Sequence, residues 1–408
     1  MALASTGALR QELARAFPRR PFTVRFWDGS ALHATETPAP TFTIASPVAL
    51  AHVLRAPGEL GLGRAYATGL IEADDLDAAL LVVDTFEPPA LSLSQQARLG
   101  LALVRATGLV RPPRAPAAEL RLRGERHTLI RDRRAVQHHY DVGNDFFALF
   151  LDPSMTYSCA RFDLLGEGGE PASLEQAQTA KLESICAKLA LKPGDRVLEV
   201  GCGWGSFAMH AASRHQVTVV GLTLSERQAE LARRRIADAG LAERIEIRLC
   251  DYRELGGERF DAIASIEMIE AVGAERVDLF AGCLADALAG GGRLAIQGIA
   301  KLKDLDTPDE GPFSERVVFP DGVPLPISRV TLALERAGLA PAELEAFPDN
   351  YVETLARWIA ALERRSDDAV ALVGADRVRI WRLYLRSARQ AFQTGWATVY
   401  QLRAGKPA

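Results

Sequence analysis

A glycine-rich stretch at residues 199–205 has the composition of a ligand-binding turn. It reads Glu-Val-Gly-Cys-Gly-Trp-Gly, follows an apolar run and precedes a helical pattern. Glycines let the backbone turn tightly and approach a ligand, while the N–H groups of the following helix point toward it. A dinucleotide-binding turn would more usually read G-x-G-x-x-G, with an acidic residue about 20 residues later. The next apolar run instead ends in Gly-Leu-Thr-Leu-Ser at residues 221–225. The stretch therefore predicts a ligand-binding turn that differs from the usual dinucleotide-binding one, and a tight turn without a ligand is the alternative.

Strands and helices that would position this turn alternate from residue 192 onward. This alternation predicts an α/β fold with a doubly wound, mostly parallel, Rossmann-like sheet, whose site lies outside the carboxyl ends of the strands. The expected strands are residues 195–201, 216–223, 244–251, 260–267 and 292–299, and residues 225–240 are an expected helix.

The N-terminal part has a different pattern. Residues 21–36 alternate apolar and polar side chains around Asp28-Gly29, which predicts a hairpin. A helix is expected from about Pro47 to Leu54, and a Pro/Ala/Arg-rich linker at residues 111–118. We therefore expect an α+β accessory domain at residues 1–117 and a second domain at residues 118–408.

Composition narrows the class of protein. The net charge of −4 over 408 residues gives no reason to expect nucleic acid as a partner. The five cysteines form no C-x-x-C pair and no cluster with metal spacing, so we expect reduced thiols, a cytoplasmic protein and no metal. No signal peptide and no membrane-spanning run is evident.

Four motifs resemble those of a known family. The E-x-G-C-G-x-G pattern resembles motif I of the class I S-adenosylmethionine (SAM)-dependent methyltransferases. The stretch HHYDVGNDFFALFLDPSMTYSCARF at residues 138–162, GCGWG at 201–205, GLTLSERQ at 221–228 and IEMIEAVG at 266–273 occur in order. Together they closely resemble the cyclopropane-fatty-acyl-phospholipid synthase family, from about residue 120 to the C-terminus.

The resemblance implies a C-methyltransferase that acts on unsaturated acyl chains of membrane phospholipids. The methyl carbon of SAM would add to the double bond and give a cyclopropane. A hydride shift before deprotonation would instead give a methylene branch, which a reductase partner could saturate to a 10-methyl type chain. Two further hypotheses are a methyltransferase for a soluble small molecule and a cofactor-binding subunit without activity of its own, because the fold alone does not determine the substrate. A homodimer is left open.

The resemblance also assigns cofactor-binding positions. Glu199 is expected to orient the loop or the cofactor amine, and Asp251 to lie against the adenine. Trp204 is as readily a packing residue as a ligand contact. The full expected set is Tyr157, Ser158, Glu199, Gly201, Gly203, Trp204, Gly205, Thr223, Ser225, Gln228, Asp251 and Tyr252.

A bound bicarbonate is implied as the base that removes a proton from the carbocation. Its ligands in the family match Cys159, Glu270, Ile299 and Tyr351. Gln297 stands where many members carry His, and a Gln amide can donate to an anion but never carries positive charge. Each residue alone would be read as an ordinary polar contact, and their joint occurrence in family motifs favours a catalytic set.

Two segments suggest a lipid-facing role. Residues 111–140 hold eight arginines against three acidic residues, a charge that suits anionic head groups, although a solvated helix face is the alternative. We expect peripheral association with the inner face of the cell membrane. Residues 378–403 form an amphipathic pattern with aromatic residues among arginines, which either caps the core or lines an acyl tunnel.

Overall fold

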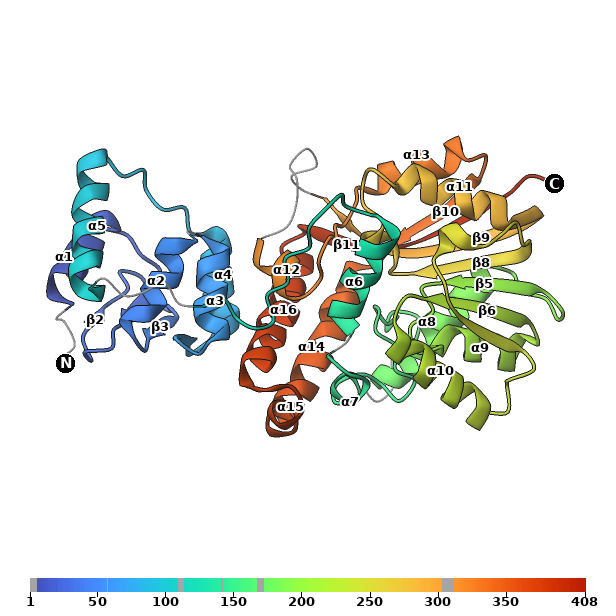
Figure 1. Ribbon diagram of the computed structural model, residues 1–408, viewed down its shortest axis with the longest axis horizontal. Coiled ribbons are helices and arrows are strands. Elements are labelled where there is room, and N and C mark those ends of the chain that lie inside the picture. Colours follow the sequence, from blue (N-terminus) through green and yellow to red (C-terminus); the bar gives the residue numbers. More distant parts are fainter. Residues whose placement is uncertain (1–5, 57, 109–113, 141, 167–171, 303–311) are drawn as a thin grey trace. The chain divides into compact units, whose positions relative to one another are not determined.

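The computed structural model describes residues 6–56, 58–108, 114–140, 142–166, 172–302 and 312–408 (Figure 1). Its contacts divide the chain into two compact units. The first comprises residues 1–119, 311–318 and 373–390, and the second comprises residues 120–310, 319–372 and 391–408. The first unit therefore draws on two segments that the sequence assigned to the second domain. The expected linker lies partly outside the described residues.

The first unit contains a four-stranded sheet with helices packed on it. The expected hairpin is present, with β1 antiparallel to β2, and the sheet order is β2-β1-β3-β4. Ser46 begins the expected helix by accepting a hydrogen bond from the Val48 N–H. The elements are α1 (Gly7–Ala16), β1 (Thr23–Arg25), β2 (Ala31–Leu32), β3 (Thr41–Ile44), α2 (Pro47–Arg55), α3 (Glu59–Ala67), β4 (Ile71–Ala73), α4 (Leu76–Thr85), α5 (Leu93–Thr107), α12 (Pro312–Val317) and most of α16 (Ala375–Gln393).

The second unit is built on a seven-stranded sheet of order β10-β11-β9-β8-β5-β6-β7. Strands β5 to β9 pair in parallel, and β11 is antiparallel to both neighbours. The strands are β5 (Arg196–Val200), β6 (Thr218–Thr223), β7 (Ile245–Leu249), β8 (Phe260–Ile266), β9 (Leu288–Lys301), β10 (Ala340–Ala346) and β11 (Ala397–Gly405). The prediction of a doubly wound, mostly parallel sheet is confirmed, and the five expected strands are β5 to β9, whereas β10 and β11 were not expected.

Helices cover both faces of this sheet (Figure 1). Side chains alternate between the faces, so that Val197 packs under α8, α9 and α10 whereas Leu198 packs under α11 and α13. The helices of this unit are α6 (Leu129–Tyr140), α7 (Asn144–Phe147), α8 (Leu174–Lys188), α9 (Ser206–His215), α10 (Glu226–Asp238), α11 (Val277–Ala287), α13 (Ile327–Arg336), α14 (Pro348–Arg364) and α15 (Ser366–Val373), with short 3-10 turns η1 (Tyr252–Glu254) and η2 (Ile269–Ala271).

The segment with the amphipathic pattern is divided between a helix and a strand. Helix α16 ends at Gln393, and the residues from Ala397 onward form β11. Strand β11 pairs with β9 over nine residue pairs, which places Gln401 opposite Gln297. The period of apolar residues could not reveal this strand because its partner lies about a hundred residues earlier in the chain.

Candidate active site

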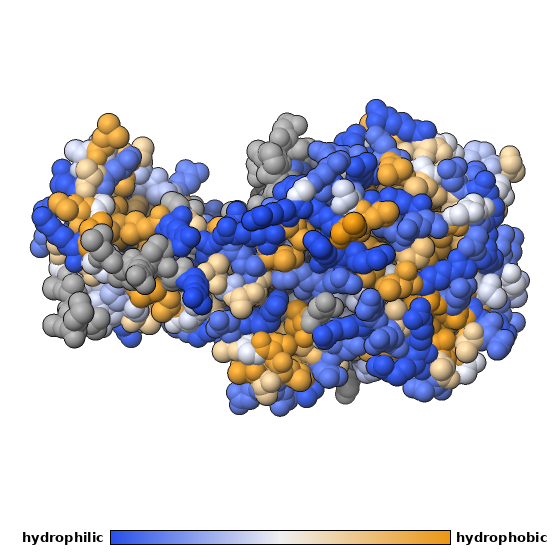
Figure 2. Space-filling model, in the orientation of Figure 1, coloured by the Kyte–Doolittle hydropathy of each residue, from blue (hydrophilic) through white to orange (hydrophobic). Residues whose placement is uncertain are grey.

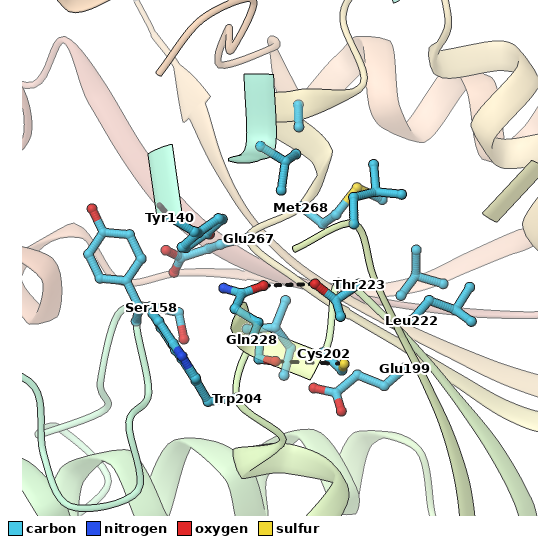
Figure 3. A pocket seen from close by; sticks show the side chains of 18 of the residues that line it. Tyr140, Ser158, Glu199, Cys202, Trp204, Leu222, Thr223, Gln228, Glu267 and Met268 are labelled. Carbon is cyan, nitrogen blue, oxygen red and sulfur yellow. Dashed lines mark hydrogen bonds between the residues drawn. The ribbon is translucent and has the colours of Figure 1, made fainter. Parts of the chain in front are cut away.

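One pocket lies at the carboxyl ends of strands β5, β6, β7 and β8, as expected for this type of sheet. Helix α6 and the segment before α8 contribute the opposite wall. In Figure 3 the side chains of Leu222 and Thr223, at the end of β6, lie across the cavity from Tyr140 and Trp204. Ten of the expected cofactor-binding residues line it: Tyr157, Ser158, Glu199, Gly201, Gly203, Trp204, Thr223, Gln228, Asp251 and Tyr252.

The glycine loop takes a backbone conformation that favours glycine. The φ angles of Gly201, Gly203 and Gly205 are +84°, +51° and +83°. A Cβ added to Gly201 would lie 2.8 Å from the Met268 Cγ, whereas one added to Gly203 would meet no atom within 4 Å. Gly203 borders the pocket, so this open space belongs to the cavity. The loop therefore lets a ligand approach the backbone itself.

Glu199 is a buried carboxylate at the floor of the pocket. It is 2% exposed, and its Oε2 has no hydrogen-bond partner among the described residues. Burial raises the pKa of Glu199 well above its ordinary value, and the charge of Lys181 opposes this shift. A buried carboxylate oxygen without a partner is costly, which indicates that a donor from a ligand completes this site.

Thr223, Ser225 and Gln228 form one local arrangement at the start of α10. The Thr223 hydroxyl donates to the Gln228 Oε1 at 2.8 Å, as Figure 3 shows. Ser225 instead accepts from the Gln228 N–H and caps the helix, and it is fully buried. Ser225 and Gly205 do not line the pocket, so they support the residues that do.

Trp204 both packs and borders the pocket. Its indole Nε1–H donates to the Asn144 Oδ1 at 2.8 Å, and its ring lies 5.0 Å from that of Phe147. The ring of Tyr140 lies edge-on to the Trp204 indole, with 5.7 Å between the ring centres. The ring of Tyr157 stacks on Trp358 at 5.2 Å. These aromatic side chains give the pocket an apolar wall that excludes water.

Asp251 and Tyr252 lie at the end of β7. The Asp251 carboxylate accepts from the Arg253 Nε and Nη2, each at 2.7 Å, and Arg253 also bonds Asp132 on α6. Asp251 therefore holds the loop after β7 against α6, in addition to bordering the cavity.

Lys181 is a pocket residue that the sequence did not single out. It extends from α8, and its Nζ donates to the Ser158 Oγ at 2.7 Å. Burial lowers the pKa of Lys181 to about 8. Its position in helix α8 carried no signal, because only the tertiary fold turns this side chain toward the pocket.

The expected bicarbonate ligands converge on a carboxylate of the chain. The Cys159 backbone N–H and the Gln297 Nε2 both donate to the Glu267 Oε1 at 2.8 Å. The Tyr351 hydroxyl donates to the Glu267 Oε2 at 2.6 Å. Glu267 itself lines the pocket, whereas none of its three donors does.

Glu270 and Ile299 form a separate contact. The Ile299 N–H donates to the Glu270 Oε1. Glu270 is 7% exposed and does not line the pocket, and burial together with the charge of Glu267 raises its pKa to about 8. At neutral pH Glu270 is therefore largely a neutral acid.

The sequence reasoning missed Glu267, although it lies in the quoted motif at residues 266–273. Its φ angle is +50°, in a region that residues other than glycine rarely adopt. Its N–H donates to the Gln297 carbonyl at 2.7 Å, which holds this conformation. Strained backbone of this kind clusters at functional sites. An acidic residue at the carboxyl end of an expected strand was the available signal.

The fold also brings together three side chains that sequence spacing did not group. Ligand atoms of Cys186, His210 and His215 lie within 4.8 Å of one another. Glu183 bonds the Nε2 of both imidazoles, at 2.9 and 3.2 Å. These hydrogen bonds account for the position of the two histidines, and the expected absence of a metal stays a prediction.

Known proteins resemble this chain in sequence and in fold. Residues 127–402 match the family described as mycolic acid cyclopropane synthetase. A "Probable fatty acid methyltransferase" of Mycobacterium tuberculosis is 35% identical over 97% of this chain and 93% of its own length. The tuberculostearic acid methyltransferase of the same organism is 33% identical over 100% of this chain and 93% of its own length. A solved mycolic acid cyclopropane synthase complexed with SAH and CTAB is 32% identical, with a TM-score of 0.63 over 67% of this chain and 98% of that chain.

The strand order and the glycine-loop pocket define a Rossmann-like methyltransferase. Within that class, the chain belongs to the mycolic acid cyclopropane synthetase family, a family of SAM-dependent methyltransferases.

Proposed function

We propose that this protein transfers the methyl carbon of SAM to a double bond in an unsaturated fatty acyl chain of a membrane phospholipid. The observation that carries the proposal is a cavity in which a glycine loop and the Glu199 carboxylate meet aromatic walls and a second carboxylate, Glu267. This reaction requires a cavity with a polar end for the cofactor and an apolar end for the hydrocarbon chain.

The pocket residues fit SAM. The Glu199 oxygen that lacks a partner among the described residues suits the amino group of the cofactor, and the Lys181 ammonium suits its carboxylate. Asp251 and Tyr252 border the part of the cavity expected to take the adenosine. When bound, SAM supplies an electrophilic methyl group on a sulfonium ion.

The apolar wall fits an alkene substrate. An isolated alkene is a poor nucleophile, so it must be held close to the methyl group and in line with it. Addition leaves a carbocation, which water would capture in an open site. Tyr140, Tyr157 and Trp204 line the cavity, and aromatic side chains there would limit the access of water and favour a nearby cation.

Two products are compatible with this chemistry. The sequence favoured a cyclopropane. A methylene or methyl-branched product is favoured by one observation: the tuberculostearic acid methyltransferase matches all of this chain, whereas the cyclopropane synthase with SAH matches 67% of it. A reductase would be the partner that saturates a methylene branch.

The lipids of a host that lacks such enzymes test this proposal. We expect expression of the protein to produce phospholipid acyl chains one CH2 unit heavier, at the expense of monounsaturated chains. Fragmentation of the isolated acyl chains distinguishes a ring from a branch. Methylation of a soluble metabolite with unchanged lipids would contradict the proposal and favour the small-molecule hypothesis.

The start of helix α6 is a candidate membrane-contacting surface. Leu129 and Ile130 are 42% and 70% exposed, and Arg133 and Arg134 are exposed one turn later. Figure 2 shows this small apolar area among hydrophilic side chains. The same helix lines the pocket, so a lipid held there would have a short path to it. Exposed apolar side chains beside arginines suit the interface of an anionic bilayer.

Arg131 does not belong to this surface. Its Nε and Nη2 donate to the buried Asp321 carboxylate at 2.5 and 2.7 Å. This ion pair joins α6 to the segment before α13, so Arg131 has a structural role. No helix among the described residues is long and apolar enough to cross a membrane.

The double change Arg133→Gln, Arg134→Gln is expected to weaken binding to vesicles that contain anionic phospholipid. Each basic residue near such a surface contributes about 1 kcal/mol, so the loss is about 30-fold in affinity. Co-sedimentation at low salt measures it, and raising salt should have the same effect on the unchanged protein. The matched control is the double change Arg234→Gln, Arg244→Gln, which alters two exposed arginines outside α6. Equal binding by both double variants would contradict this surface.

A further inference from the structure

The donors that the resemblance assigns to bicarbonate are already engaged. The Cys159 N–H, the Gln297 amide and the Tyr351 hydroxyl all donate to Glu267, and the Ile299 N–H donates to Glu270. A bicarbonate ion at this place would need the same donors and would add a further negative charge beside two carboxyl groups. The residues present therefore do not fit bicarbonate.

We propose that Glu267 itself is the base of the reaction, and that its carboxylate occupies the position that an external anion would otherwise take. The inference rests on the proposed function, because it concerns the proton that acyl methylation releases. Three donors from three separate elements converge on Glu267, whose side chain lines the pocket beside Tyr157 and Ser158.

The surrounding contacts hold Glu267 in place. Gln401 on β11 donates to the Gln297 Oε1 at 3.0 Å, which turns the Gln297 Nε2 toward Glu267 and the Cys159 carbonyl, to both of which it donates. Tyr351 packs on Phe392 at 4.6 Å, and burial beside Glu267 raises the pKa of Tyr351 well above its ordinary value. Tyr351 thus remains a donor. Burial also raises the pKa of Glu267, which makes it a better proton acceptor than an exposed carboxylate.

The step balances without another reactant. The π electrons of the alkene form a bond to the methyl carbon, and the electrons of the broken S–C bond stay on sulfur. The carbocation on the neighbouring carbon then loses a proton to the Glu267 carboxylate. The C–H electrons close a cyclopropane ring or, after a hydride shift, form a C=C bond. Glu267 becomes a carboxylic acid and releases its proton to water before the next turnover.

The test uses bicarbonate as the probe and the whole 408-residue chain with SAH. Calorimetry is expected to show no binding of bicarbonate to the unchanged protein, since Glu267 holds the donors. Glu267→Ala frees the three donors and leaves a cavity, so we expect it to bind bicarbonate. Saturable binding by the unchanged protein at this site, abolished by Tyr351→Phe, would overturn the proposal. This readout does not depend on any lipid product, so it is separate from the test of the proposed function.

Turnover supplies the second measurement. In buffer freed of carbon dioxide, the unchanged protein is expected to keep its activity on unsaturated phospholipid, and Glu267→Gln to lose about 10²- to 10⁴-fold. Added bicarbonate should restore part of the activity of Glu267→Ala but not of Glu267→Gln, whose side chain fills the site. Loss of activity by the unchanged protein on removing bicarbonate, with recovery on its return, would contradict the assignment.

Two variants complete the comparison. Glu270→Gln makes the same change three residues later, on a group that is already largely neutral at pH 7, and we expect a loss at least tenfold smaller than for Glu267→Gln. Glu243→Gln changes an exposed glutamate that does not line the pocket. SAH binding and thermal melting of each variant distinguish a lost base from a lost fold. A larger loss for Glu270→Gln than for Glu267→Gln would overturn the proposal.

Discussion

Gly203→Val is expected to abolish binding of SAH while the protein remains folded. The Cβ would project into open space at the pocket, where a ligand must meet the backbone. We expect affinity to fall at least about 100-fold, which corresponds to about 2.8 kcal/mol. Isothermal titration with SAH measures this loss, and circular dichroism follows the fold.

Strain must be separated from obstruction in this experiment. Gly203 has φ of +51°, so any side chain there costs about 1–3 kcal/mol of stability. Gly240→Val is the matched control, because Gly240 has φ of +68°, is exposed and borders no part of the pocket. Equal loss of melting temperature in both variants, with SAH binding lost only in Gly203→Val, is the expected result. Normal SAH binding by a folded Gly203→Val would refute the assignment of the loop.

Glu199→Gln is expected to weaken SAH binding by at least about 30-fold. Removing one charge of a buried, hydrogen-bonded charge pair costs about 2–5 kcal/mol. The amide keeps the size of the side chain, so the pocket should survive. Glu243→Gln again serves as the control for a change of charge alone.

The pH dependence of binding gives this prediction a second readout. Burial raises the pKa of Glu199, so the group is protonated and neutral below that raised value. An ammonium ligand needs the carboxylate form, so SAH affinity of the unchanged protein should rise with pH toward the raised pKa of Glu199, by up to about tenfold per unit, and level off above it. Glu199→Gln should show a weaker dependence over this range. Identical pH profiles for the two proteins would show that Glu199 does not bind the cofactor.

Local patterns in the sequence were sufficient for the five parallel strands of the sheet and for the glycine loop. A strand alternates its side chains with a period of two, and a helix begins at a capping residue such as Ser225, so both can be read from neighbouring residues. The tight turn of the loop could also be predicted from its glycines, because a positive φ angle depends on the residue itself and not on its distant neighbours. Ten of the twelve expected cofactor-binding residues accordingly lie at the pocket.

Only the tertiary structure shows which side chains surround Glu267, the carboxylate that we propose as the base. Glu267 contacts Cys159 and Tyr351 across separations of 108 and 84 residues, and no local period reports such contacts. From the same motif, at residues 266–273, the resemblance pointed to Glu270 as a bicarbonate ligand. The two glutamates differ in which way their side chains leave the chain after β8, a difference set by the positive φ angle of Glu267 and by its hydrogen bond to Gln297 on β9.

The same limit explains Arg131 and strand β11. Sequence alone determined that residues 111–140 are rich in arginine, but the fold decided that Arg131 is committed to Asp321 and that Arg133 and Arg134 remain exposed. Likewise the sequence shows the amphipathic pattern of the C-terminal segment, but only the pairing with β9 makes the end of that segment a strand. Spacing along the chain determines which face of an element a side chain takes, whereas its partner depends on which distant element packs against that face.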